Sequence, residues 1–210
     1  MDWRRIVRHC RREIPVRMRR VLGKLGYRFD QWGRVVYIDE WKLYLSKLPL
    51  SKVDALEISP GSIAHWRDFG FRSYSSVDFP DFDITKQALP GSFGVIIAEH
   101  VLEHLPDPYA AVENIRSMLT DDGVFILATP FLVRIHDMPG DYYRWTPAGM
   151  KVFLKKCGFD CEVRAWGNRR CIRANFNRWP NYGWWRILRN EQDFPLVVWA
   201  YARKSSASVS

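Results

Sequence analysis

The feature that most limits the fold of this chain is an alternation, from residue 53 onward, between short apolar runs and segments of helical periodicity. Short apolar runs bounded by turn residues are typical of buried strands, and helical patterns between them are typical of βαβ units. The alternation therefore predicts an α/β fold with a mostly parallel, open sheet. The strand-like runs are Val53–Ile58, Tyr74–Val77, Phe93–Ala98, Val124–Ala128, Cys161–Trp166 and Pro195–Tyr201.

Three helical patterns separate the later runs. Val101, Leu102 and Leu105 share one helical face, and a second pattern over 111–119 is followed by the helix-stopping residues at 121–123. A third helix is predicted over 146–157, because Thr146 is a suitable N-cap, proline follows at the first helical position, and a glycine stands at 158.

Composition narrows the class of protein. Of the 210 residues, 47% are apolar and 26% charged, which excludes wholesale disorder. We find neither the ~20-residue apolar stretch of a membrane span nor a secretory signal, and four cysteines without C-x-x-C pairs favour reduced thiols in the cytoplasm. We expect a basic helical segment over 1–50, a main domain over 51–204 with an Arg/Trp-rich insertion at 166–190, and a flexible tail at 205–210.

Positive charge is concentrated in two segments. Residues 1–28 carry nine Arg and one Lys against two acidic residues, and residues 163–190 carry seven Arg and no acid. The whole chain has a net charge of +9, so the rest of the chain is acidic. Such segments attract anionic partners, including membrane surfaces that residues 1–28 could contact peripherally as amphipathic helices. A solvated face, or helices docked on the protein itself, are the alternatives.

Polar residues end the predicted strands. In an open parallel sheet, ligands bind outside the carboxyl ends of the strands. The first strand ends in a tight turn from Glu57 to Gly61, which can bring backbone N–H groups against a ligand. Asp78 follows Glu57 by 21 residues, close to the offset at which a carboxylate accepts the ribose hydroxyls of a nucleotide. The turn lacks the full G-x-G-x-x-G spacing.

Two longer segments carry a family resemblance. The segment 93–108, which contains E-H-V-L-E-H-L-P-D-P, and the segment 119–130, L-T-D-D-G-V-F-I-L-A-T-P, resemble class I S-adenosylmethionine-dependent methyltransferases, most closely the small type 11 and type 23 group. The resemblance implies a Rossmann-like sheet of about seven strands with a C-terminal antiparallel hairpin. It also implies S-adenosylmethionine as cofactor.

The resemblance assigns roles to individual residues. Glu57, Ser59 and Gly61 would form the cofactor loop, and Asp78 would hold the ribose. Asp83 and Ile84 would lie beside the adenine, while Glu99 and His100 would face the methionine moiety or the transferred methyl group.

The segment after the fifth strand of the family, residues 131–146, lies where this fold places the acceptor. Methyl transfer to a hydroxyl requires removal of a proton, which suits an imidazole. We therefore predict O-methylation of a small or medium acceptor that bears negative charge or is carried on a lipid or glycan. His136 is the predicted general base and His100 the second choice, with Asp141, Tyr143 and Arg144 orienting the acceptor. The alternative is that these side chains only pack or tie down the loop.

Three other functions fit parts of the sequence. His100 to His104 also spell H-x-x-E-H, a zinc motif, but the sequence places no third ligand, so the predicted site contains no metal. An RNA or DNA methyltransferase would account for the positive charge, but the N-P-P-Y tetrapeptide of exocyclic amine methylation is absent, and nucleic acid is not the expected partner. The third function is that of a non-catalytic module that binds the cofactor, a membrane or a polymer.

Overall fold

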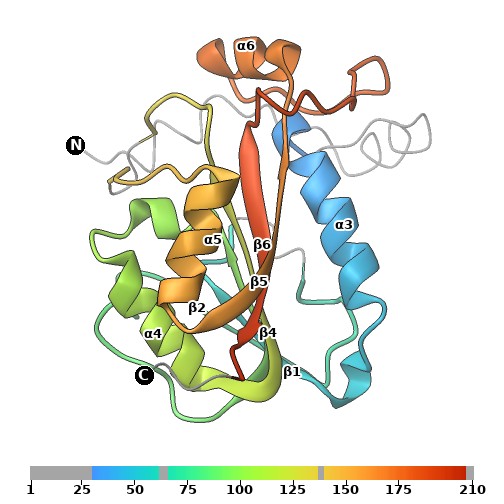
Figure 1. The fold of residues 1–210 in the computed structure, drawn as a ribbon. Coiled ribbons are helices and arrows are strands. Elements are labelled where there is room, and N and C mark those ends of the chain that lie inside the picture. Colours follow the sequence, from blue (N-terminus) through green and yellow to red (C-terminus); the bar gives the residue numbers. More distant parts are fainter. Residues whose placement is uncertain (1–29, 62–65, 137–139, 207–210) are drawn as a thin grey trace.

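The computed structural model describes residues 30–61, 66–136 and 140–206, and in them one six-stranded sheet forms the centre of the molecule (Figure 1). The strand order is β2-β1-β3-β4-β6-β5. The strands are β1 (Asp54–Ile58), β2 (Ser73–Val77), β3 (Phe93–Glu99), β4 (Leu119–Pro130), β5 (Phe159–Trp166) and β6 (Val197–Lys204).

The strand directions confirm the predicted fold class. β1 pairs in parallel with β2 and β3, and β3 pairs in parallel with β4, while β6 is antiparallel to both β4 and β5. The C-terminal antiparallel pair thus closes an otherwise parallel sheet. The described residues contain six strands rather than the expected seven or so.

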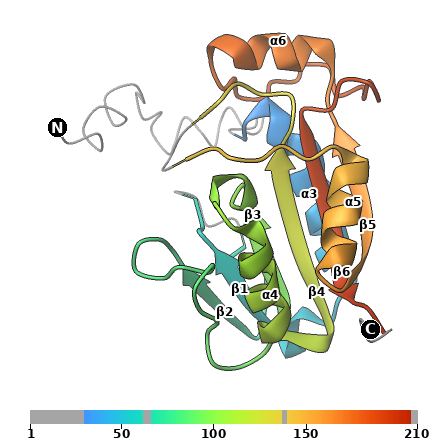
Figure 2. The ribbon, with the colours of Figure 1, turned by 60° about the vertical axis from the view of Figure 1, so that its left-hand side comes forward.

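Helices cover both faces of the sheet (Figure 2). α3 packs Tyr37, Ile38 and Trp41 into the core on one face, and α4 and α5 bury their apolar sides in the core on the other. Strands buried on both faces explain the nearly continuous apolar runs of β3 and β4. The helices are α3 (Val35–Leu45), α4 (Pro108–Met118), α5 (Pro147–Lys156) and α6 (Arg169–Asn177), with 3₁₀ turns at Trp32–Arg34, Leu50–Lys52 and Leu102–His104.

The helix predicted over 146–157 is confirmed with its boundaries. The hydroxyl of Thr146 accepts a hydrogen bond from the backbone N–H of Gly149, and Pro147 is the first helical residue. Gly158, at φ +78°, adopts the left-handed conformation that ends the helix.

Two predicted helical features are wrong. The pattern at 101–105 forms only the 3₁₀ turn Leu102–His104, because His100 before it is left-handed at φ +56° and Leu105 is held extended by the proline that follows. The residues at 121–123 do not end a helix. α4 already ends at Met118, and the strand from Leu119 onward runs through them with a register shift.

The structure describes one of the two basic segments. The helices predicted within residues 1–28 lie outside the described residues. The Arg/Trp-rich insertion comprises α6 and the chain after it, which lie above the carboxyl ends of β3 and β4 (Figure 2). None of the described helices is long and apolar enough to cross a membrane.

Candidate active site

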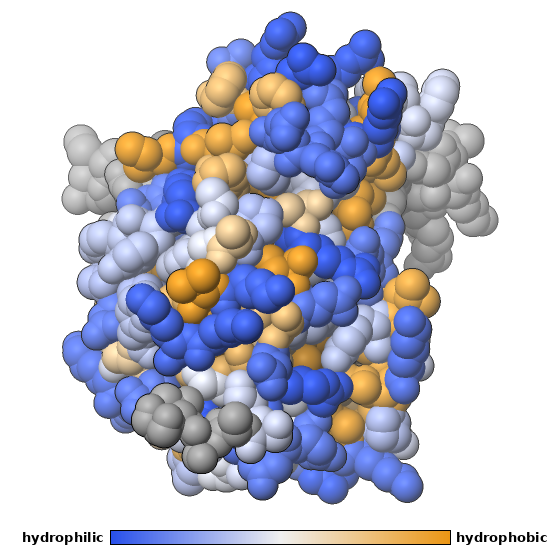
Figure 3. All heavy atoms as spheres, viewed as in Figure 1, coloured by the Kyte–Doolittle hydropathy of each residue, from blue (hydrophilic) through white to orange (hydrophobic). Residues whose placement is uncertain are grey.

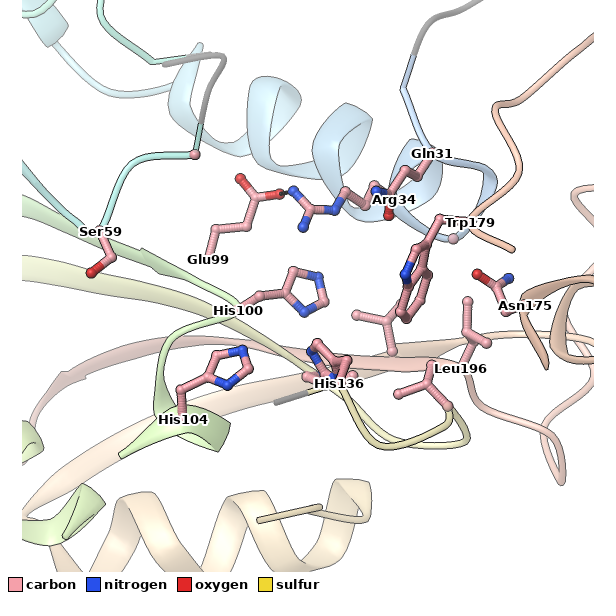
Figure 4. Close-up of a pocket in the computed structure, with 15 residues that line it drawn as sticks. Gln31, Arg34, Ser59, Glu99, His100, His104, His136, Asn175, Trp179 and Leu196 are labelled. Carbon is pink, nitrogen blue, oxygen red and sulfur yellow. Dashed lines mark hydrogen bonds and ion pairs between the residues drawn. The ribbon is translucent and has the colours of Figure 1, made fainter. Parts of the chain in front are cut away.

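A cleft opens at the carboxyl ends of the parallel strands, beneath α6 (Figure 4). The chain before α3, the ends of β1, β3 and β4, and the insertion all contribute to its wall. The lining residues are Gln31, Gly33, Arg34, Ser59, Gly61, Glu99, His100, His104, Pro130, Val133, His136, Asn175, Trp179, Leu196 and Val197. Of the predicted site residues, Ser59, Gly61, Glu99, His100 and His136 line it.

The turn after β1 forms one end of the cleft. Ser59 is left-handed at φ +51°, and its backbone N–H donates to the carbonyl of Val77, 2.7 Å away, which ties the turn to the end of β2. A Cβ atom added to Gly61 would meet nothing within 4 Å, so the backbone here borders open space. The turn therefore leaves room for a ligand to approach the backbone.

Glu57 lies beneath this turn rather than in the cleft wall. Its side chain is buried, and one carboxylate oxygen accepts a hydrogen bond from the hydroxyl of Tyr74. Burial raises the pKa of Glu57 to about 7, against the opposing effect of the Tyr74 hydrogen bond.

The acidic residues after β2 lie outside the cleft lining. Asp78 is exposed at the end of β2 and accepts a hydrogen bond from the backbone N–H of Phe79 at 2.9 Å. Asp83 accepts from the hydroxyl of Thr85 at 2.6 Å, and hydrogen bonds from Thr85 and Lys86 lower its pKa. Ile84 is buried in the core. The Asp78 carboxylate thus stays accessible to solvent.

Glu99, at the end of β3, is held by two residues from the N-terminal part of the fold. Arg34 lies 3.0 Å from its Oε1, and the hydroxyl of Tyr37 donates to the same oxygen at 2.7 Å. Both contacts join residues more than 60 positions apart in the sequence. No sequence signal identified Arg34 or Tyr37 as site residues.

The next residue, His100, is fixed by the same tyrosine. Its Nε2 lies 3.1 Å from the Tyr37 hydroxyl. Because that hydroxyl donates its only proton to Glu99, Nε2 of His100 must carry the proton and donate to Tyr37, which leaves Nδ1 without one. Burial, and after it the positive charge of Arg34, lower the pKa of His100 well below its usual value.

The Nδ1 atom of His100 faces a buried carboxylate, that of Glu103. Glu103 is fully buried, and within the described part of the chain neither of its oxygens has a hydrogen-bond partner. Its Oε1 lies 3.4 Å from Nδ1 of His100, 3.6 Å from Nε2 of His104 and 3.9 Å from Nε2 of His136. Burial raises the pKa of Glu103 to about 7. We call these four residues the histidine cluster.

His136 is held by an acidic residue on its own loop. Its Nδ1 lies 3.1 Å from Oδ2 of Asp141, which also accepts the backbone N–H of His136 at 2.9 Å. The guanidinium of Arg144 donates to both oxygens of Asp141. Burial acts to raise the pKa of Asp141, but these hydrogen bonds outweigh it and lower that pKa to about 2. Asp141 and Arg144 therefore support His136.

Tyr143, the remaining predicted residue, lies elsewhere. Its hydroxyl donates to the carbonyl of Pro106 at 3.2 Å, and its ring stacks on Trp145. The insertion supplies an aromatic wall in its place. Trp179 lies with its ring centre 5.7 Å from that of His136, beneath the guanidinium of Arg134 at 4.7 Å.

Three of these side chains could hold a metal ion. Ligand atoms of Glu103, His104 and His136 all lie within 4.8 Å of one another. The H-x-x-E-H segment does not form the helical pair of histidines of the zinc motif, since His100 precedes the 3₁₀ turn and the two histidines do not share a helical face. The third candidate ligand comes from the loop after β4, which the motif does not include.

Comparison with known proteins agrees with the fold. Residues 40–125 match the family model described as a methyltransferase domain. No curated protein matches the chain significantly.

Solved structures are similar over most of the chain. An S-adenosylmethionine-dependent methyltransferase from Mesorhizobium loti has a TM-score of 0.55 at 17% identity, with 79% of this chain and 97% of that chain covered. One from Clostridium acetobutylicum has a TM-score of 0.56 at 9% identity, with 84% and 93% covered. A DhpI-SAM-HEP complex has a TM-score of 0.52 at 14% identity, with 81% and 87% covered. At these identities the structures show the fold alone.

The sheet order, the cleft at its carboxyl edge and the similar structures define the class I methyltransferase fold. The family match over residues 40–125, which is less than half of the chain, agrees with this fold. The narrower assignment to the type 11 and type 23 group stays a prediction.

Proposed function

We propose that the protein transfers a methyl group from S-adenosylmethionine to an oxygen of a small-molecule, glycan or lipid-linked acceptor. The observation that carries the proposal is the cleft, which runs from the open turn at Ser59 and Gly61 to the histidine cluster. One end offers backbone to a cofactor, and the other offers polar side chains to an acceptor.

The residues present fit this cofactor. The exposed carboxylate of Asp78 is free to accept the two hydroxyls of a ribose, and Gly61 leaves space for close approach to the backbone. When bound, S-adenosylmethionine supplies an electrophilic methyl group on a sulfonium. The structure of DhpI, which its description places in complex with SAM, supports the same assignment.

The chain's own task is to align the acceptor and help its hydroxyl lose a proton. His100 and His136 both line the cleft, and the pKa of each is lowered by burial, which favours neutral imidazoles at physiological pH. His136 directs Nδ1 to Asp141 and Nε2 into the cluster. The predicted base role of His136, with His100 as second choice, belongs to this proposal, and Asp141 and Arg144 would act through His136.

Positive charge around the cleft favours an acceptor with anionic groups. Arg34 and Arg134 lie at or beside the cleft, and α6 exposes Arg169, Arg170 and Arg173 above it. Figure 3 shows a largely hydrophilic surface at the α6 end, with apolar side chains between. Peripheral contact with anionic membrane through residues 1–28 is part of the proposal. Retention on anionic vesicles should weaken with added salt and on deletion of these residues.

Isothermal titration with S-adenosylmethionine and S-adenosylhomocysteine tests the cofactor assignment. Chelator-treated protein should bind both in the micromolar range. Asp78→Ala should weaken binding by about tenfold or more because two charge-assisted hydrogen bonds are lost. Asp81→Ala, an exposed acidic residue in the same loop, is the matched control and should bind as the wild type does.

The same titration separates the alternative of a non-catalytic module. A protein that binds neither compound would support a module acting through its basic segments. Binding of both, without methyl transfer to any hydroxylated acceptor, would support a cofactor-binding module instead.

A further inference from the structure

The most unusual group in the cleft is the carboxylate of Glu103. It is fully buried and, within residues 30–61, 66–136 and 140–206, accepts no hydrogen bond on either oxygen. A buried carboxylate normally has hydrogen-bonding partners or coordinates a cation, because burying it otherwise is costly. The nearest candidate partners are ring nitrogens of His100, His104 and His136, at 3.4 to 3.9 Å.

Two of those rings are oriented as metal-binding histidines are. Nδ1 of His104 contacts the backbone carbonyl of Gly140, which can only accept, so this nitrogen carries the proton. Nδ1 of His136 faces the ionised carboxylate of Asp141, which fixes the same tautomer. In both rings Nε2 is therefore unprotonated and faces Glu103. A carbonyl or carboxylate on the outer nitrogen is the usual support of a metal-binding imidazole.

The spacing fits a tetrahedral ion. Ligand atoms at ~2.1 Å from a zinc ion stand ~3.4 Å apart. Oε1 of Glu103 lies 3.6 Å from Nε2 of His104 and 3.9 Å from Nε2 of His136, within a few tenths of an ångström of that spacing. The ligand atoms of all three residues lie within 4.8 Å of one another. Both histidines line the cleft.

We propose that Glu103, His104 and His136 bind one divalent first-row transition-metal ion of the zinc type, with an open position toward the cleft. Two imidazoles and one carboxylate with an open fourth position are the ligand set of catalytic zinc sites. The binding site does not depend on the proposed function. Its use does, since an oxygen of the acceptor would occupy the open position. His136 would then be a ligand rather than a free base.

His100 is the competing partner of Glu103. Its unprotonated Nδ1 faces Oε1, so a proton shared between the two would satisfy the carboxylate without a metal. This alternative predicts a protein that takes up no metal and tolerates loss of His104.

Direct metal binding distinguishes the two. Untagged full-length protein is stripped with a chelator, dialysed and titrated with Zn²⁺ by calorimetry and with Co²⁺ by visible absorption. We expect one equivalent of Zn²⁺ to bind at micromolar or tighter Kd, and the Co²⁺ complex to show the intense bands of four-coordinate cobalt. His104→Ala and His136→Ala should each weaken binding by about 100-fold or more.

Conservative variants keep the test valid where an alanine variant does not fold. Glu103→Gln keeps the volume of the side chain but removes its charge and should weaken Zn²⁺ binding at least tenfold. Asp141→Asn removes only the support of His136 and should weaken it by about 10- to 100-fold. Glu113→Gln, on the exposed side of α4, is the control and should bind as the wild type does. Circular dichroism checks that each variant is folded.

Binding of S-adenosylmethionine to the same samples separates the two proposals. Zn²⁺ binding without cofactor binding would refute the proposed function and leave the metal site standing. Cofactor binding by a protein that takes up no Zn²⁺ or Co²⁺, or equal Zn²⁺ affinity in folded Glu103→Gln and His104→Ala, would overturn the metal site.

Discussion

The two ends of the cleft are built in different ways. At the cofactor end, Ser59 and Gly61 line the cleft, and Asp78, outside the lining, presents an exposed carboxylate. At the other end, every ring of the histidine cluster is held by a second group, and the central carboxylate is fully buried.

This difference matches two tasks, binding of the cofactor at one end and catalysis at the other. A strand-end turn can bind a nucleotide with backbone groups and one carboxylate, so it tolerates side-chain variation at most positions. A catalytic group must be held within a few tenths of an ångström, which requires supporting contacts from other segments. We therefore expect substitutions at the two ends to have separable effects, on cofactor affinity at one end and on turnover at the other.

The largest expected effect on turnover is that of His136→Ala. It removes an imidazole that acts on the acceptor as base or as metal ligand, so turnover should fall by about 10² or more. Affinity for S-adenosylmethionine should change less than twofold, because the cofactor end is untouched. Single-turnover rates and titration on the same preparation measure both. Ile135→Ala, at the exposed neighbouring residue, is the control. A parallel loss of cofactor affinity would show that the two ends are not independent.

The sequence also predicted the two ends of the cleft to different extents. The strands and the turn after β1 follow from apolar runs and turn residues that are adjacent in the chain. α5 was also predictable, because Thr146 and Gly158 cap it locally. The seating of α3 on the sheet was not, since nothing local indicates that Tyr37 reaches Glu99, a residue 62 positions away.

The histidine cluster was predicted only in pieces. His100 and His136 were identified as polar residues near strand ends, but their convergence on Glu103 depends on the irregular loop after β4. Long-range contacts hold that loop: the backbone N–H of Tyr142 donates to the carbonyl of Glu103, and Nδ1 of His104 contacts the carbonyl of Gly140. The motif that contains Glu103 and His104 predicted a helix, and the left-handed backbone at His100 prevented one.

The next prediction tests the buried carboxylate beneath the cofactor end. The pKa of Glu57 is raised by burial to about 7 from 4.5, so the folded state favours the protonated form. Its contribution to stability is complete below pH 4.5 and is lost as the pH rises through 7. Compared with Glu57→Gln, the cofactor-free wild type should lose about 3 kcal/mol over that range. Urea denaturation at several pH values measures it. A flat difference for Glu57→Gln would mean that its pKa is ordinary.

A smaller effect is expected where α3 supports the cluster. Tyr37→Phe removes the hydroxyl shared by Glu99 and His100, which leaves buried polar atoms with fewer partners. The free energy of unfolding should fall by about 1 to 2 kcal/mol. Tyr44→Phe removes a hydroxyl that accepts from the exposed Arg203 and should cost less than about 0.5 kcal/mol. Equal losses would show that the Tyr37 hydroxyl adds no more stability than a surface contact.

The smallest expected effect is that of Tyr143→Phe. It sharpens the comparison because Tyr143 lies in the loop of His136 but is not among the residues that line the cleft. Its hydroxyl donates to the carbonyl of Pro106, and its ring stacks on Trp145 at 5.2 Å. Phenylalanine keeps the stacking and loses one partly exposed hydrogen bond, so turnover should change less than about threefold, and stability by less than about 1 kcal/mol. Steady-state kinetics with the methyl acceptor measure the first and urea denaturation the second. A fall in turnover as large as that of His136→Ala, with stability unchanged, would place the Tyr143 hydroxyl at the acceptor. The loop would then have to move when the acceptor binds, and the division between the two ends would hold only for the ligand-free protein.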